Sequence, residues 1–495
     1  MSLLQRCANR FAVALAPLCQ NSSLIRSWKF APSRLFFSFA KLAKTEVARP
    51  WQRHTAVRLL SSDIEHGAVF EGLVRGGHAT MVPSDVDLKP YAGLDASKLS
   101  SEEKERLVIM ATDALKKHMF EKTRAISEPL ALAKHAAAQC LYGRSIAMIA
   151  MQRVLKQQPP DGRELLKARA WLQRSVDNGY HPACEHLALL LLATGEKAQA
   201  EIYLRKGGDA GSSRCFQILG TLCAGEPNRV NEALSYLHRA YKRGSMEALV
   251  QIGLIYESGM GEIAADLMKA LSVFRQAAET GDRDGQYHLG RVLLTHTKGH
   301  LAEARQHLEG AAEKGSVDSR IALADAHLRG LFGAESSVSA AIGWVQDIAK
   351  QGANPEAMYL LAIALAKIGK FVEAVEHLQR AMKMGHVKSM VFLADLHGSG
   401  GAGSAQSKAE AYRLYANALN AAKAEEEDES TADQIATRVE IHQKMAAILE
   451  AGTGVKQDLR AALGHYKQAL QLGDKSAMRH VSRLSDLLQS NTLSS

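Results

Sequence analysis

Proline, aromatic residues and long apolar runs are all scarce in this sequence. Only 11 of its 495 residues are proline, and 6% are aromatic. The longest apolar runs, near 187–193 and 357–366, are about half as long as the roughly 18 residues that a membrane-spanning helix needs. With little proline to interrupt it, a chain rich in alanine, leucine, glutamate and lysine favours helix. The sequence therefore predicts an all-α protein with no transmembrane segment.

Cysteine is also scarce, and the motifs of common catalytic and metal sites are missing. None of the six cysteines forms a C-x-x-C pair, and their spacing suits neither a zinc site nor a small disulfide framework. There is no H-E-x-x-H, G-x-S-x-G or Walker-type motif. The sequence therefore indicates no catalytic residue, no cofactor and no metal site. Four cysteines are expected to be small buried helix residues: Cys140, Cys184, Cys215 and Cys223.

Net charge is absent beyond residue 60. The formal charge of +9 comes from 61 basic and 52 acidic residues. Residues 1–60 contain ten of the basic residues and a single acid, Glu46, which leaves 51 basic and 51 acidic residues in the rest of the chain. A neutral remainder argues against a nucleic-acid-binding protein with a generally basic surface.

Residues 1–60 have the composition of a mitochondrial transit peptide, because they are rich in arginine and serine and nearly free of acids. Arg58-Leu59-Leu60-Ser61-Ser62 resembles the matrix-peptidase site that is cut two residues after an arginine, which would release a chain starting at Ser61. A secretory signal is the alternative, because Phe11–Cys19 is an uncharged apolar stretch. Basic residues continue for about forty positions beyond that stretch, so we expect a mitochondrial protein of the matrix.

Most of the chain carries an internal repeat. A chain of this length is too long for one compact core, and its glycines recur at spacings of 36, 32, 33, 37, 34, 37 and 33 residues. Ala422 takes the place of glycine in the next copy, and an acidic insertion at 423–437 precedes the last one. The glycines are Gly143, Gly179, Gly211, Gly244, Gly281, Gly315, Gly352, Gly385 and Gly473.

Positions around each glycine repeat as well. In most copies alanine stands eleven residues before it, a large apolar residue seven before and a small residue four before, as in Ala233, Leu237 and Ala240 before Gly244. These spacings place the three residues on one helical face. A small residue also stands four positions after the glycine and a large one eight after. Each unit is therefore predicted to be a helix, a glycine-terminated turn and a second helix.

Two segments resemble the Sel1-like repeat family, a variable-length relative of tetratricopeptide repeats. Leu449-x-x-Gly452-x-Gly454-Val455-x-x-Asp458 is the better copy, and Tyr256-Glu257-Ser258-Gly259-Met260-Gly261 is a second. The resemblance covers about 126–485 and implies a right-handed α-solenoid of about ten antiparallel helical hairpins. A pentatricopeptide array, which reads single-stranded RNA, is the alternative. The small packed position after each glycine and the neutral remainder argue against it.

The repeats suggest how the chain is divided. The expected parts are a transit peptide (1–60), an N-terminal arm with a capping helix from 101 to about 122 (61–125), the solenoid (126–486) and a disordered tail (487–495). The acidic insertion 423–437 is interpreted as a solvated loop. A docking element for a basic partner is the other interpretation.

Two features imitate chemical sites. Gly398-Ser399-Gly400-Gly401-Ala402-Gly403 fits the G-x-G-x-x-G dinucleotide pattern, but it follows a predicted helix instead of the strand that the motif needs. We therefore interpret it as a repeat turn. Four histidines recur six or eight residues before the glycine and are interpreted as packing or surface residues: His238, His307, His377 and His465.

The resemblance implies binding as the function. Sel1-like proteins act as adaptors, so we expect a scaffold that holds protein partners of a multi-subunit mitochondrial complex on a concave face. The binding residues are unknown. Trp171, Tyr236 and Trp344 are candidate anchors, interpreted as core because they sit on the packed stripe. An RNA-associated protein of mitochondrial gene expression would need a basic concave stripe, and an enzyme would need a convergent polar pocket.

Overall fold

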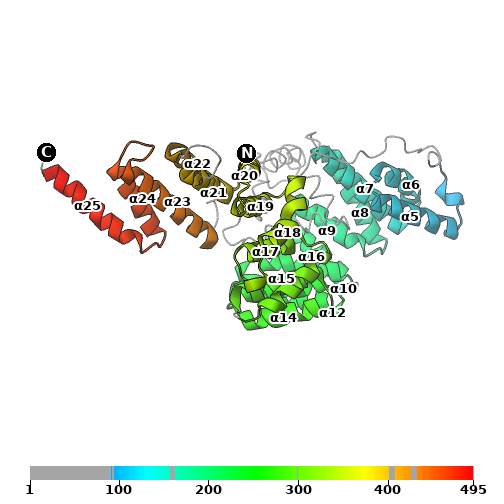
Figure 1. Cartoon of the computed structure of the whole chain (residues 1–495). Helices are drawn as coiled ribbons and strands as arrows, with labels where there is room; N and C mark the ends of the chain where they lie inside the picture. Colours follow the sequence, from blue (N-terminus) through cyan, green and yellow to red (C-terminus); the bar gives the residue numbers. More distant parts are fainter. Residues whose placement is uncertain are drawn as a thin grey trace. The chain divides into compact units, whose positions relative to one another are not determined.

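All regular secondary structure in the described part of the chain is helical (Figure 1). The computed structural model describes residue 91 and residues 94–155, 162–297, 299–400, 407–424 and 432–493. Within these residues there is one isolated bridge, between Met260 and Ile263, and no strand. The predicted all-α class is confirmed. The predicted transit peptide and most of the N-terminal arm lie outside the described residues.

The chain divides into two compact units, 1–273 and 274–495. The helices of the first unit are α5 (Ser101–Lys116), α6 (Phe120–Leu132), α7 (Ala136–Leu155), α8 (Gly162–Asp177), α9 (Ala183–Ala193), α10 (Lys197–Asp209), α11 (Ser213–Ala224), α12 (Val230–Lys242) and α13 (Met246–Ser258). Helix α14 (Leu267–Glu279) contains the boundary. The helices of the second unit are α15 (Arg283–His296), α16 (Leu301–Glu313), α17 (Val317–Leu328), α18 (Val338–Gln351), α19 (Pro355–Lys367), α20 (Phe371–Lys383), α21 (Val387–Ser399), α22 (Lys408–Ala424), α23 (Ala432–Ala451), α24 (Leu459–Gln471) and α25 (Ala477–Leu493).

Most odd-numbered helices form an antiparallel hairpin with the even-numbered helix that follows them. In the first unit α7 packs along α8, α9 along α10 and α11 along α12. In the second unit α15 packs along α16, α19 along α20, α21 along α22 and α23 along α24. This is the predicted α-solenoid arrangement, in which each hairpin buries its apolar face against its neighbours.

Along α7–α13 and α15–α19 the odd-numbered helices lie on the inner side of the curve, and α21 and α23 hold the same place in the repeat. Cα atoms of consecutive odd-numbered helices approach within 8 Å at several positions, in the pairs α7/α9, α9/α11, α11/α13, α15/α17 and α17/α19. No pair of consecutive even-numbered helices is packed as closely in the described residues. A row of helices that is closer together on one side curves toward that side. We therefore call the odd-numbered helices inner and the even-numbered helices outer.

The hairpin α11/α12 shows how the repeated small and large residues hold two helices together. Ala233, Leu237 and Ala240 of α12 are fully buried. A Cβ atom added at Gly220 of α11 would lie 2.6 Å from Cγ of Leu237. The small residues therefore let the helices approach, and Leu237 fills the space between them. Truncating such a buried leucine to alanine costs about 2–5 kcal/mol.

Glycine follows the outer helices because the turn needs a positive φ. Gly244 follows α12 with φ of 91°, and the N–H of Ser245 donates to the carbonyl of Ala240 at 3.1 Å. This Schellman geometry strains a residue that has a side chain by about 1–2 kcal/mol. The predicted turn glycines are confirmed at this site and at seven others with positive φ: Gly179, Gly211, Gly281, Gly315, Gly352, Gly385 and Gly473.

The prediction that Gly143 lies in a turn is wrong. Gly143 is inside α7 and is not among the glycines with positive φ. A Cβ atom added there would lie 2.9 Å from Cγ of Leu172, so Gly143 has the same crowded environment as Gly220. The turn before α7 is made by Lys134, with φ of 60°. The regular spacing therefore grouped Gly143, a glycine in a helix contact, with glycines that lie in turns.

Two predicted boundaries also differ from the structure. The single capping helix expected from 101 to about 122 is a hairpin, because α5 ends at Lys116, α6 begins at Phe120 and His118 between them has φ of 58°. The boundary drawn at residue 126 therefore falls inside α6. At the other end, α25 continues to Leu493, through most of the predicted tail.

The predicted insertion 423–437 is partly helical. Helix α22 continues to Ala424 and α23 begins at Ala432, while residues 425–431 lie outside the described part of the chain. Leu449 of α23 takes the repeat position of Tyr256 in α13, which makes Thr437 the equivalent of the turn glycine. The first residues of α23 are therefore extra helix that the other inner helices lack.

The four cysteines are buried, as predicted. Burial raises the pKa of Cys215 to about 12, which suppresses the reactive thiolate.

Candidate functional site

The glycine-rich segment near residue 400 begins at the end of a helix. Gly398 lies within α21, and Gly400 caps that helix with φ of 80°. Gly259 and Gly452 follow inner helices with φ of 63° and 65°. A dinucleotide-binding turn follows a strand. Gly400 therefore occupies a repeat turn, as interpreted from the sequence.

The four recurring histidines lie on outer helices and do not form a metal site. His238 is exposed, whereas His307 and His377 are half-buried, and burial lowers the pKa of both of these imidazoles. Nδ1 of His465 lies 2.9 Å from Nδ1 of the buried His442 in α23. In the described ranges no group of three or more histidine, cysteine, aspartate or glutamate side chains could hold a metal ion. In the same ranges no helix is both long enough and apolar enough to cross a membrane.

The three candidate aromatic anchors are core residues of outer helices. Trp171 is 9% exposed, and the guanidinium carbon of Arg174 lies 4.7 Å from the centre of its ring. Tyr236 stacks on Phe216 at a centroid distance of 5.9 Å. Trp344 is half-buried against two hydrophobic clusters of the second unit. Their interpretation as core residues agrees with these contacts, so a binding surface has to be sought elsewhere.

On the inner face of the first unit, polar side chains bond to one another. Arg214 of α11 lies 3.9 Å from Glu185 of α9 and 2.7 Å from Glu247 of α13. Gln217 is buried and donates to Glu247 at 2.6 Å. This ladder joins three inner helices, and its polar groups satisfy one another without a ligand.

The inner face of the second unit carries apolar and aromatic side chains instead. The sixth residue after the turn glycine is Glu185 in α9 and Gln217 in α11, but Tyr287 in α15 and Ile321 in α17. Tyr359 has this position in the copy that is shifted by one residue, and its ring meets that of Phe392 edge to face at 6.2 Å. We call the half-buried apolar side chains of this face the inner strip: Tyr287, Ile321, Tyr359, Ile363 and Phe392.

Carboxylates from several inner helices surround the centre of the inner strip. Burial, followed by the charges of Glu356, Glu440, Asp325 and Asp433, raises the pKa of Tyr359 to about 12. These four carboxylates belong to α19, α23 and α17, so the acidic surroundings are built by hairpins that are distant in sequence. The Tyr359 hydroxyl remains protonated and available as a hydrogen-bond donor at neutral pH.

Two lysines cross between inner helices and hold part of this negative charge. Lys388 lies 2.7 Å from Asp433, and Lys444 lies 2.7 Å from Asp395 and 2.5 Å from Glu440. Burial acts to lower the pKa of both lysines, but the bonds to carboxylates outweigh it, so both pKa values are raised. Each lysine is therefore charged and already paired.

Glu356 at the edge of the strip is also ionised. Its Oε2 lies 2.9 Å from Nε2 of His386. Burial acts to raise the pKa of Glu356, but the hydrogen bond and charge of His386 outweigh it and lower the pKa. The inner strip therefore lies beside carboxylates that keep their charge at neutral pH.

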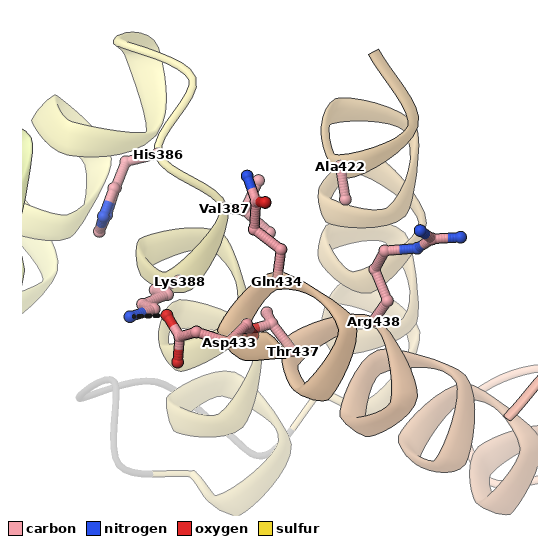
Figure 2. Close-up of a pocket in the computed structure, with 8 residues that line it drawn as sticks. All are labelled: His386, Val387, Lys388, Ala422, Asp433, Gln434, Thr437 and Arg438. Carbon is pink, nitrogen blue, oxygen red and sulfur yellow. Dashed lines mark hydrogen bonds and ion pairs between the residues drawn. The ribbon is translucent and has the colours of Figure 1, made fainter. Parts of the chain in front are cut away.

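A cavity of about 130 Å³ opens beside these residues, where α21 begins and α22 ends (Figure 2). Figure 2 shows Lys388 reaching across to Asp433 of the extra helical residues of α23. Small-molecule sites measure about 300–1,000 Å³, so this cavity has the size for a single side chain of a partner. It is lined by His386, Val387, Lys388, Ala422, Asp433, Gln434, Thr437 and Arg438.

The sequence contained a signal for this face that a motif search does not detect. Motif searches align what the repeats share, whereas the inner strip lies at a position where the repeats differ. The sixth residue after the turn glycine is Glu185 in α9 and Gln217 in α11, then Val250 in α13, Tyr287 in α15 and Ile321 in α17, with Tyr359 at the shifted position in α19. Val250 is buried, so the half-buried apolar residues begin with Tyr287. That change from polar to apolar marks the strip.

No protein-family model matches the chain. An F-box protein of Arabidopsis thaliana is 35% identical to it over 96 residues, which is 19% of this chain and 26% of that protein. The chain thus matches about a quarter of the length of this curated relative.

Two solved structures of bacterial repeat proteins are similar to the chain. A protective antigen of uropathogenic Escherichia coli with an SLR fold is 22% identical, covers 72% of this chain and 81% of its own, and has a TM-score of 0.45. A Sel1 repeat protein of Oxalobacter formigenes is 23% identical, covers 65% of this chain and 92% of its own, and has a TM-score of 0.45. The solenoid fold follows from the chain's own helices and turns.

Proposed function

We propose that this chain is a Sel1-like repeat scaffold of a multi-subunit mitochondrial complex, and that it holds a partner protein on the inner face of its second unit. The observation that carries the proposal is the inner strip, in which the rings of Tyr359 and Phe392 meet and carboxylates surround Tyr359. The partner segment would place apolar side chains on the strip and basic side chains beside the carboxylates.

The contrast with the first unit supports this choice of face. There, Arg214 already satisfies Glu185 and Glu247, so the inner polar groups need no partner. In the second unit Tyr359 and Phe392 remain half-exposed on the concave side, where helical-repeat proteins bind extended or helical segments. A few aromatic anchors near the centre of an interface carry most of its binding energy.

The test is affinity purification of the tagged full-length chain from isolated mitochondria. Tyr359→Ala and Phe392→Ala are each expected to weaken partner recovery by about tenfold or more, the effect of losing an aromatic anchor. Tyr203→Ala is the matched control, because Tyr203 is a half-buried tyrosine on the outer helix α10 of the first unit. Thermal melting followed by circular dichroism would verify that the three variants fold alike.

Three results would count against the proposal. Equal loss of partners in the Tyr203 control would mean that the loss of binding is not specific to substitutions in the inner strip. Loss of all partners after RNase treatment would favour an RNA-associated protein of mitochondrial gene expression. Recovery of the tagged chain from the secretory pathway would refute the mitochondrial location.

A further inference from the structure

The outer helices of the two units differ in surface charge. Along α8, α10 and α12, with the residue that caps α12, eight exposed side chains are basic and three are acidic. Along α16, α18 and α20, with the residue that caps α16, four are basic and four are acidic. These helices hold the same place in the repeat, so helix geometry does not explain the difference. We call the first set the outer basic face: Arg163, Lys167, Arg174, Arg205, Lys206, Arg239, Lys242 and Arg243, with Asp177, Asp209 and Glu232 among them.

The outer basic face is continuous across three helices. Arg169 of α8 lies 2.5 Å from Glu196 just before α10, and Arg239 of α12 lies 2.7 Å from Asp209 at the end of α10. These ion pairs hold the outer helices side by side. The positive charges therefore form one surface that spans three hairpins.

Much of this positive charge is not neutralised by the protein. Arg239 and Arg205 are paired, the latter with Glu201 at 3.6 Å. Lys167, Lys206 and Lys242 form no ion pair with any residue that the structure describes. An anionic partner would therefore meet these charges without having to break an ion pair, although Nζ of Lys167 lies 5.7 Å from the centre of the Tyr142 ring.

Two exposed aliphatic side chains lie within the outer basic face. Leu166 on α8 is 49% exposed and Ile202 on α10 is 62% exposed. Ile202 precedes Arg205 and Lys206 by three and four residues, so the three side chains share one side of the helix. Aliphatic side chains among basic ones suit the boundary between lipid headgroups and acyl chains.

Two aromatic rings near this face, those of Trp171 and Phe216, are covered by arginines. The guanidinium carbon of Arg174 lies 4.7 Å from the ring centre of Trp171, and that of Arg239 lies 3.9 Å from the ring centre of Phe216. Proteins that bind single-stranded RNA stack its bases on uncovered rings. Together with the exposed Leu166 and Ile202 among the basic residues, this favours a lipid surface over RNA as the anionic partner.

We propose that the outer basic face docks the chain onto the surface of an anionic lipid bilayer, with Leu166 and Ile202 entering the headgroup region. The docking is peripheral and uses none of the residues of the inner strip, which belongs to the second unit. It does not depend on the proposed scaffold function. Each cation near an anionic membrane surface strengthens binding roughly fivefold.

The test is flotation of the full-length chain with vesicles of phosphatidylcholine, with and without phosphatidylserine. All proteins carry glutamine in place of the ten basic residues of 1–60, because that segment would bind anionic lipid by itself. The triple variant Lys167→Gln, Lys206→Gln, Lys242→Gln is expected to lose roughly a hundredfold in affinity for the anionic vesicles. The control Lys350→Gln, Lys383→Gln, Lys467→Gln removes three exposed lysines from outer helices of the second unit and is expected to bind like the parent.

A second pair of substitutions separates lipid from other polyanions. Leu166→Ser with Ile202→Ser is expected to weaken vesicle binding and to leave binding of poly(U) RNA and polyglutamate unchanged. The proposal is overturned if the parent does not float with anionic vesicles, or if both triple variants behave alike. It is also overturned if the serine variant binds vesicles normally while RNA or polyglutamate competes with them, because the face would then be a polyanion site.

Discussion

The crowded position of Gly143 predicts opposite substitution preferences at two glycines that look equivalent in the sequence. Alanine at Gly143 gains about 1 kcal/mol in helix propensity. Its Cβ, however, would lie 2.9 Å from Cγ of Leu172 and 3.1 Å from the carbonyl oxygen of Ala168, and such overpacking costs about 1–3 kcal/mol. We expect Gly143→Ala to destabilise the first unit by up to about 2 kcal/mol. Asparagine adds a larger polar group to the same contact, so Gly143→Asn is expected to cost about 1–3 kcal/mol more.

Gly179 should show the reverse order. Nothing lies within 4 Å of a Cβ added there, but φ is 86°. Alanine is strained in that region by about 1–2 kcal/mol, whereas asparagine enters it more readily. Urea unfolding followed by circular dichroism would give the stabilities. Hydrogen exchange in α7 and α8 would assign the loss to this hairpin, since repeat arrays can unfold in stages. If Gly143→Asn is more stable than Gly143→Ala, the backbone at residue 143 has the positive φ of a turn, and the packing argument is refuted.

Three further predictions concern packing, pH and the thiols. Leu237→Ala should lower the free energy of unfolding of the first unit by about 2–5 kcal/mol in urea titrations, since Leu237 is fully buried against Gly220, and a loss below about 1 kcal/mol would contradict that packing. The folded-state pKa of Glu356 is lowered from 4.5, so its contribution to stability is complete above that pH and is lost as the pH falls below it. Glu356→Gln should therefore flatten the fall in urea midpoint between about pH 6 and about pH 3, and an unchanged slope would refute the role of the His386 contact. With the pKa of Cys215 at about 12, a thiol reagent should label it slowly in the native protein and rapidly in urea, as mass spectrometry of the peptide would show.

The helices and turns could be predicted because they depend on residues close together in the sequence. Ala233, Leu237 and Gly244 lie within one helix and its turn, and their pattern recurs in most copies. The predicted turn at Gly143 is wrong because the residue type alone does not distinguish a glycine in a turn from a glycine in a helix contact. What distinguishes them is the neighbour, Leu172, which lies in the next helix. Contacts between helices are therefore not encoded in a local sequence pattern.

The candidate site was harder to predict, because it depends on which helix face the stacking leaves open. Glu185 and Tyr287 hold the same repeat position, yet the first is bonded within a polar ladder and the second lies on an apolar strip. The acidic surroundings of Tyr359 depend on Glu440 and Asp325, which come from other hairpins. The extra helical residues that bring Asp433 to Lys388 were expected to be a loop.

The contacts that join the hairpins also determine how the molecule would respond to force. Arg239 donates to Asp209 over 30 residues, Arg214 reaches Glu247 over 33, and Lys314 reaches the carbonyl of Gly281 over 33. Each bond therefore spans about one repeat. A chain pulled from one end would release one hairpin after another, each step lengthening it by a similar amount and leaving the next hairpin intact. The molecule should therefore lengthen under force in a series of similar steps, and it should refold from any hairpin that remains folded.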